Sequence, residues 1–217
     1  MNAIEHILTP WSASWWGWTM FLLLLCGIAS EFMQPGVISQ AHRSLLSHND
    51  RTYKDAPRNL YGQLLVTLFR TGTIAMGINL CVYSGGELSF TAYAAVIGAI
   101  FGTMLLKRIC NGLLGYTFML SQRSAPVYEQ YGDLTTICAC LLYPAILVAV
   151  HLGSIHAVRW ICAAVAVLFL VVWTYRVGRT YACSPAALLY IALYIGTLEI
   201  LPMGGLLYLS SIMITTL

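Results

Sequence analysis

The chain has 217 residues, of which 59% are hydrophobic and 9% are charged, and its formal net charge is +3. A soluble domain carries about 25% charged residues, so too few polar side chains are present to cover the surface of a water-soluble fold. The composition excludes a soluble enzyme, a disordered tail and a nucleic-acid-binding protein. Together with the mean hydropathy of +0.77, it predicts a protein that crosses a membrane several times.

Six apolar stretches are long enough to cross a bilayer as helices. A helix needs about 20 apolar residues to do so, because every backbone N–H and C=O group must be paired within the segment. The sequence thus predicts an all-α fold, a polytopic integral membrane protein made of one transmembrane helical domain over residues 1–217. The predicted spans are about 15–33, 61–83, 88–106, 134–152, 157–177 and 184–215.

Basic residues are divided unequally between the two sides of these spans. Nine of the eleven lie in or beside connections on one side, at about 39–60, 107–133 and 178–183. Arg159 lies on the other side, and Arg70 lies within a span. Basic residues are retained on the cytoplasmic side of a membrane. We therefore expect both termini to face outward.

Aromatic residues gather near the ends of the predicted spans. Their amphipathic rings suit the headgroup depth of a bilayer, so we expect them to anchor the helices at the two interfaces. At the inner interface they include Tyr131 and Trp173, and at the outer interface they are Trp11, Trp15, Trp16, Trp18, Trp160 and Tyr208.

The predicted connection at 107–133 carries apolar residues at helical spacing, namely Ile109, Leu113, Tyr116 and Leu120. This stripe predicts that the helix of the third span continues along the membrane interface. A helix that binds a partner would show the same pattern.

The chain has seven cysteines, an odd number, and most of them lie inside apolar runs. In that setting a cysteine behaves as a small hydrophobic residue. Cys138 and Cys140 are the only closely spaced pair, and residues two apart on a helix point to roughly opposite faces. We therefore expect structural cysteines.

The sequence lacks the usual catalytic signatures. It contains no glycine-rich phosphate loop, no HExxH zinc helix and no GxSxG nucleophile elbow. Asp50 and Asp55 could hold Mg²⁺ with a phosphate-bearing substrate, although a solvated loop of mixed charge explains them with fewer assumptions. We assign no catalytic residue and expect no metal site and no cofactor.

Arg70 and Glu199 are each the sole ionisable residue deep in a predicted span. A charge at mid-bilayer costs about 2.5–3.5 kcal/mol on insertion scales, so it is rarely left unpaired. We expect the two to pair, or to share a small polar network with Tyr194 and Thr197. Pro202 frees a backbone carbonyl beside Glu199 and kinks the helix, which suits an ion site and a structural bend equally. The sequence leaves both interpretations open.

Small residues recur at helical spacing on two predicted spans. Ala94, Gly98 and Gly102 form one such ridge, and Ala192 and Gly196 form another. Ridges of this kind allow the backbones of membrane helices to approach closely. We expect both to pack against other helices.

Tyr190, Tyr194, Thr197, Leu198, Glu199 and Pro202 lie in the run LYIALYIGTLEILP. This run resembles the C-terminal motif of an uncharacterised Bacteroidota membrane family, known only as a domain of unknown function (DUF4271). The overall plan of several helices with a basic connection after the first span is similar as well. The resemblance implies a multi-pass protein of the bacterial inner membrane, with its outward-facing termini in the periplasm. It implies no activity.

Three functions fit these features. The first is a non-catalytic subunit or assembly factor of an envelope- or secretion-related membrane complex, whose partners are membrane lipid and other subunits or further copies of the chain. The second is a small ion- or proton-coupled transporter that uses Arg70 and Glu199. The third is an intramembrane enzyme that acts on a lipid-linked substrate near Asp50 and Asp55. None of them involves nucleic acid.

The distribution of basic residues yields a test of orientation. Single cysteines are placed at Ser47 and Ser84 in a cysteine-free background, and intact spheroplasts are treated with a membrane-impermeant thiol reagent. Ser84→Cys should react and Ser47→Cys should not, because positive charge keeps the connection at 39–60 in the cytoplasm. The reverse pattern of labelling would contradict the predicted orientation.

Overall fold

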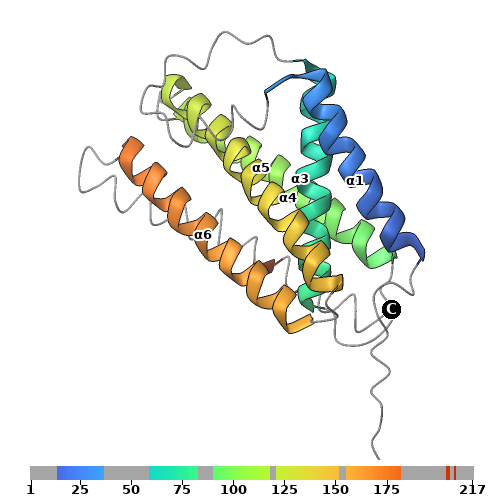
Figure 1. The fold of residues 1–217 in the computed structure, drawn as a ribbon. Coiled ribbons are helices and arrows are strands. Elements are labelled where there is room, and N and C mark those ends of the chain that lie inside the picture. The colour runs from blue at the N-terminus through green and yellow to red at the C-terminus, as the bar shows by residue number, and fades with distance from the viewer. Residues whose placement is uncertain are drawn as a thin grey trace, which may run out of the picture.

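The computed structural model describes residues 14–36, 59–82, 90–117, 121–151 and 155–181, together with Gly204, Gly205 and Tyr208. Within this part of the chain, all regular structure is helical (Figure 1). The long helices are α1 (Ser14–Met33), α3 (Leu60–Val82), α4 (Phe90–Thr117), α5 (Ser121–His151) and α6 (Ile155–Tyr181).

All five helices are long and apolar enough to cross a membrane. They coincide with the first five predicted spans, which shows that runs of apolar residues locate the helices of this chain. The sixth predicted span, 184–215, lies outside the described residues except for Gly204, Gly205 and Tyr208.

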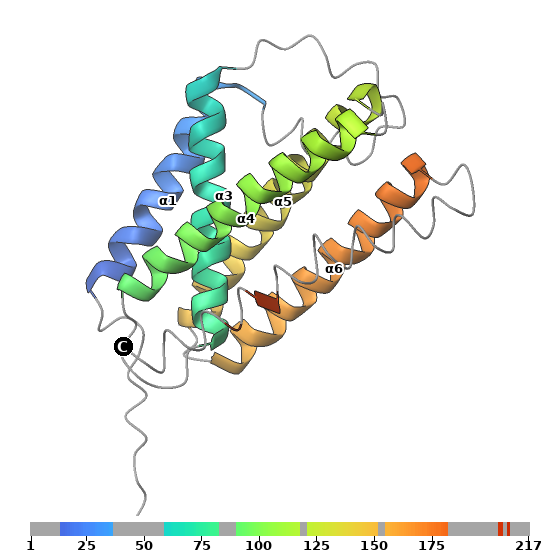
Figure 2. The same cartoon turned by 180° about the vertical axis from the view of Figure 1, so that it is seen from behind.

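Successive helices run in opposite directions, as Figures 1 and 2 show from two sides. The C-terminal parts of α4 and α6, which carry Lys107 and Arg176, therefore lie at one end of the bundle. We call it the basic end. Arg159, near the start of α6, and Cys81, near the end of α3, lie at the opposite end. Helix α1 ends and α3 begins at the basic end.

Two helices extend well beyond their apolar stretches at the basic end. The apolar stretch of α4 ends at Ile109 while the helix continues to Thr117. Helix α5 begins at Ser121, ten residues before its apolar stretch starts at Tyr131. The predicted connection at 107–133 is thus helical except at 118–120, which lie outside the described residues. Helix length and span length differ because a helix keeps its own backbone groups paired in water as well as in lipid.

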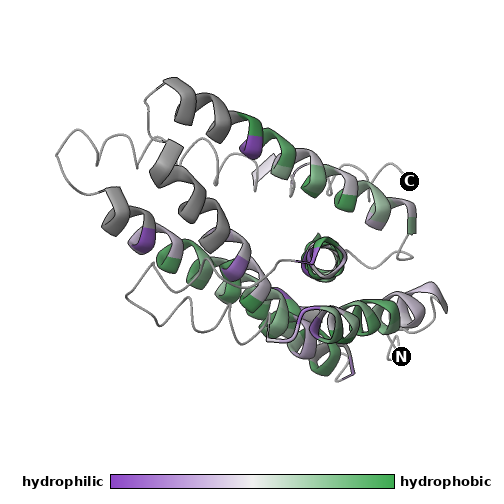
Figure 3. Ribbon diagram, turned by 90° about the horizontal axis from the view of Figure 1, so that it is seen from above, coloured by the Kyte–Doolittle hydropathy of each residue, from purple (hydrophilic) through white to green (hydrophobic). Residues whose placement is uncertain are grey.

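Helix α3 is the centre of the bundle and packs against α1, α4, α5 and α6. Figure 3 views it almost along its axis, between the other helices. About half of its apolar stretch is buried (56%), compared with 17% for α6. The buried share of the apolar stretch is smaller in every other described helix than in α3.

Glycines on α3 allow these neighbours to approach from two sides. A Cβ atom at Gly72 would clash with Leu23 of α1 and would lie 3.2 Å from the hydroxyl of Tyr93 on α4. A Cβ atom at Gly77 would lie 3.0 Å from Leu142 of α5. Because membrane helices associate through close packing, these glycines permit the contacts that hold the bundle together.

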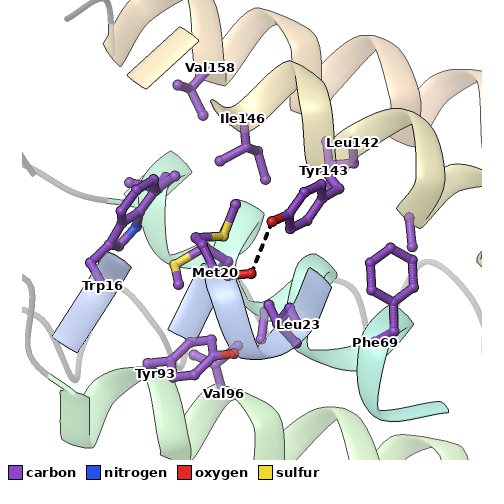
Figure 4. Close-up of a cluster of buried hydrophobic side chains, with 14 of the residues drawn as sticks. Trp16, Met20, Leu23, Phe69, Tyr93, Val96, Leu142, Tyr143, Ile146 and Val158 are labelled. Carbon is purple, nitrogen blue, oxygen red and sulfur yellow. Dashed lines mark hydrogen bonds between the residues drawn. The ribbon is translucent and has the colours of Figure 1, made fainter. Parts of the chain in front are cut away.

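The main hydrophobic core lies where α1, α3, α4 and α5 meet, and α6 adds Val158 to it (Figure 4). Trp16 has no exposed surface and is part of this core, so the prediction that it anchors at the membrane interface is wrong. The hydroxyl of Tyr143 on α5 donates a hydrogen bond to the backbone carbonyl of Met20 on α1, at 2.9 Å. A smaller cluster at the basic end joins α5 to α6 and contains Leu134, Cys138, Phe169 and Trp173.

Gly72 and Gly98 form a matched pair for testing this packing. Gly72→Leu should lower the free energy of unfolding by about 1–3 kcal/mol, because the new side chain overpacks the junction of α1, α3 and α4. Gly98→Leu should leave it within about 0.5 kcal/mol, because no described heavy atom lies within 4 Å of a Cβ atom there. Unfolding of the purified chain in mixed micelles, followed by circular dichroism, measures both. Equal losses would contradict the central position of α3.

Candidate functional site

Two cationic side chains converge on neighbouring residues of α5 towards the basic end. Arg70 is the eleventh residue of α3, and its Nη1 donates a hydrogen bond to the carbonyl oxygen of Gly132 at 3.3 Å. The Nζ of Lys107 on α4 donates to the hydroxyl of Tyr131 at 2.9 Å. Residues of three helices therefore form one polar cluster, which we call the Arg70–Lys107 cluster. It consists of Arg70, Lys107, Tyr131 and Gly132.

Gly132 allows the guanidinium of Arg70 to reach the backbone of α5. A Cβ atom at Gly132 would lie 3.0 Å from Nη1 of Arg70, closer than such contacts ordinarily are. The Gly132 carbonyl also accepts hydrogen bonds from the Oγ1 atoms of Thr135 and Thr136, each at 2.8 Å. Both threonines are buried. Arg70 is only half-buried, and its charge rests against the negative end of a carbonyl dipole.

Lys107 binds the aromatic ring of Tyr131 as well as its hydroxyl. Its Nζ lies 4.6 Å from the ring centroid, which is within the range of a cation–π contact. The same ring makes edge-to-face contacts with Phe169 and Trp173 of α6, at centroid distances of 5.6 and 5.0 Å. Tyr131 thereby links α4 to α6 through α5.

Several other interhelical hydrogen bonds in the bundle run from a side chain to a backbone carbonyl. Tyr93 on α4 donates to Gly72 at 3.4 Å, and Arg159 on α6 donates to Cys81 at 3.1 Å. Bonds of this kind join membrane helices. Among the described residues, no group of three or more His, Cys, Asp or Glu side chains could hold a metal ion.

The structure places only some of the predicted site residues. Arg70 contacts α5 through Gly132. Its expected partner Glu199 lies outside the described residues, and so do the other predicted members of the polar network and of the second ridge. These are Tyr194, Thr197, Pro202, Ala192 and Gly196.

The first ridge lies on the exposed side of α4. Ala94, Gly98 and Gly102 are all exposed, and a Cβ atom at either glycine would meet no described heavy atom within 4 Å. The expectation that this ridge packs against another helix stays a prediction. No described helix packs closely on that face.

Three residues of the cluster were not predicted as site residues. Lys107, Tyr131 and Gly132 belong to the stretch that was interpreted as a connection. Trp173, which was predicted to anchor at the inner interface, is 1% exposed and packs inside the smaller core instead of facing the surroundings. Gly132 followed closely by two threonines was the available signal, because small and hydroxylated residues together are typical of helix contacts in membranes.

The contact between Lys107 and Tyr131 can be tested by a double-mutant cycle. Tyr131→Phe removes the hydrogen bond and keeps the ring contacts, so it should cost about 1.5–3 kcal/mol of unfolding free energy, the usual value for a bond to a charged group. Lys107→Met should cost a similar amount, and the double variant should cost less than the sum. Arg108→Met, an exposed neighbour, is the control and should have little effect. Strict additivity would show that the two residues do not interact.

Comparison with known proteins identifies a family. The chain matches the family model described as a domain of unknown function (DUF4271) over residues 17–209. No curated protein and no solved structure matches it.

Proposed function

The chain belongs to the DUF4271 family, and we propose that it is a non-catalytic integral protein of the inner membrane of a Bacteroidota bacterium. It crosses the membrane six times with both termini in the periplasm, and it serves as a subunit or assembly factor of an envelope- or secretion-related complex. The apolar helices and the collection of basic residues at one end of the bundle support this location and orientation.

The exposed small-residue ridge of α4 is the observation that carries the proposed role. A helix face that meets only lipid has no need of small residues, whereas a face that meets another helix gains contact area from them. Leu105, one turn beyond Gly102, is 60% exposed and continues the face. We assign this face to an apolar transmembrane helix of another protein of the complex, a helix that carries small residues of its own.

The described polar contacts favour a structural role over transport. Arg70 donates to a backbone carbonyl, and Lys107 is held by a tyrosine. Both contacts tie helices together. A small transporter remains the second candidate because Glu199 is a predicted intramembrane acid.

A photo-crosslinking amino acid at Leu105 tests the proposed role. Illumination of cells at native expression level should produce one stoichiometric conjugate with another membrane protein, identified by mass spectrometry. The same amino acid at Val171, which is 63% exposed on α6, is the control and should label lipid. Gly98→Leu should abolish the conjugate while the chain still folds, because the added side chain separates the two backbones.

Two results would contradict the proposal. Conjugates formed only with lipid, or only with residues 184–215 of the same chain, would show that the ridge binds no partner. A Glu199→Gln variant that folds normally and keeps its conjugate, yet abolishes function in a growth assay, would favour the transporter.

A further inference from the structure

Cys81 and Cys162 meet at the contact between α3 and α6, although they are 81 residues apart in the sequence. The Sγ atom of Cys162 lies 3.8 Å from the carbonyl oxygen of Gly77 on α3. Cys81 follows Gly77 by one helical turn, and side chains on a helix lean towards its N-terminus. The thiol of Cys81 is thereby directed over Gly77, the residue whose carbonyl contacts the Cys162 thiol.

Gly77 creates the space in which the two thiols meet. A Cβ atom at this position would lie 3.4 Å from the Sγ atom of Cys162. Since glycine has no such atom, the Cys162 thiol rests directly on the backbone of α3. Both cysteines are half-buried and unbridged.

Arg159 holds the two helices in register at this point. It precedes Cys162 by three residues on α6, and its Nε donates a hydrogen bond to the carbonyl of Cys81 at 3.1 Å. Its guanidinium thus places a positive charge beside Cys81. A cation beside a cysteine is typical of thiols that exchange with disulfides.

The pair lies at the end of the bundle opposite the basic end. Cys81 is the second-last residue of α3, and Cys162 is the eighth residue of α6. In the orientation proposed above, this end faces the periplasm, where disulfides form and persist. The inference below rests on that orientation.

We propose that Cys81 and Cys162 are a disulfide-forming pair that joins α3 to α6 at the periplasmic end of the bundle. The oxidant is the disulfide of a periplasmic thiol–disulfide oxidoreductase. One cysteine attacks that disulfide as a thiolate and forms a mixed disulfide, and the other then displaces the oxidoreductase. The two thiols of this chain become one S–S bond, and the oxidoreductase leaves as a dithiol that carries the two electrons and the two protons.

The position of α6 gives this bond a structural purpose. Only 17% of the apolar stretch of α6 is buried, the smallest share among the described helices. A covalent bond to α3 fastens the least buried helix to the most buried one. The bond also closes a loop that contains α4 and α5, which restricts the unfolded chain.

Differential alkylation of the full-length chain in its own membranes tests the pair. Cells are quenched with acid, free thiols are blocked with N-ethylmaleimide under denaturing conditions, and disulfides are then reduced and labelled with an isotopic form of the same reagent. Mass spectrometry should find the isotopic label at Cys81 and Cys162 in most chains and the unlabelled reagent at Cys138, the buried control. Cys81 and Cys162 blocked before reduction would overturn the proposal.

Single substitutions test the pairing itself. In Cys162→Ser, Cys81 should become reactive before reduction, whereas Cys140→Ser should leave the labelling of both residues unchanged. A Cys81 that stays protected in Cys162→Ser would show a different partner and overturn the pair. The labelling of Ser47→Cys and Ser84→Cys tests the orientation separately, so a failed disulfide can be distinguished from a reversed topology.

Discussion

The bundle depends on glycines at which a side chain of one helix can contact the backbone of another. Gly72 and Gly77 on α3 and Gly132 on α5 are the three places at which this is most evident. At each of them an atom of a neighbouring helix occupies the space that a side chain would fill. Lipid is as apolar as the protein interior, so close packing and interhelical hydrogen bonds must hold such helices together.

The same three glycines also provide hydrogen-bond acceptors. Their carbonyls accept bonds from Tyr93 and Arg70 and contact the thiol of Cys162. A carbonyl within a helix can accept a second bond, and it is reached more easily where no Cβ atom shields it. Glycine at these positions therefore permits both the close packing and the hydrogen bonds between helices.

These contacts between helices bear on the proposed function. Several polar side chains that reach between helices end on a carbonyl or a phenol of another helix, which makes the bundle cohesive. The exposed ridge of α4 combines the same small residues with no described neighbour, and for that reason we assign it to a partner helix. The disulfide that we propose between Cys81 and Cys162 would add a covalent link between α3 and α6 at the opposite end of the bundle from Lys107.

The amino-acid sequence by itself determined where the five described apolar helices lie, that Arg70 is a charge within a span, and that Ala94, Gly98 and Gly102 share a face. These properties depend on the local order of residues along one helix. The helical spacing of Ile109, Leu113 and Tyr116 also predicted that α4 continues beyond its apolar stretch, as it does to Thr117. The start of α5 at Ser121 was not predicted, because hydropathy reports the thickness of a membrane and not the length of a helix. Only the tertiary structure decided that Trp16 is buried, that Arg70 meets Gly132, and that Cys81 meets Cys162. These contacts depend on how each helix is rotated about its axis, and an apolar residue does not reveal that rotation when the lipid outside and the protein inside are equally apolar.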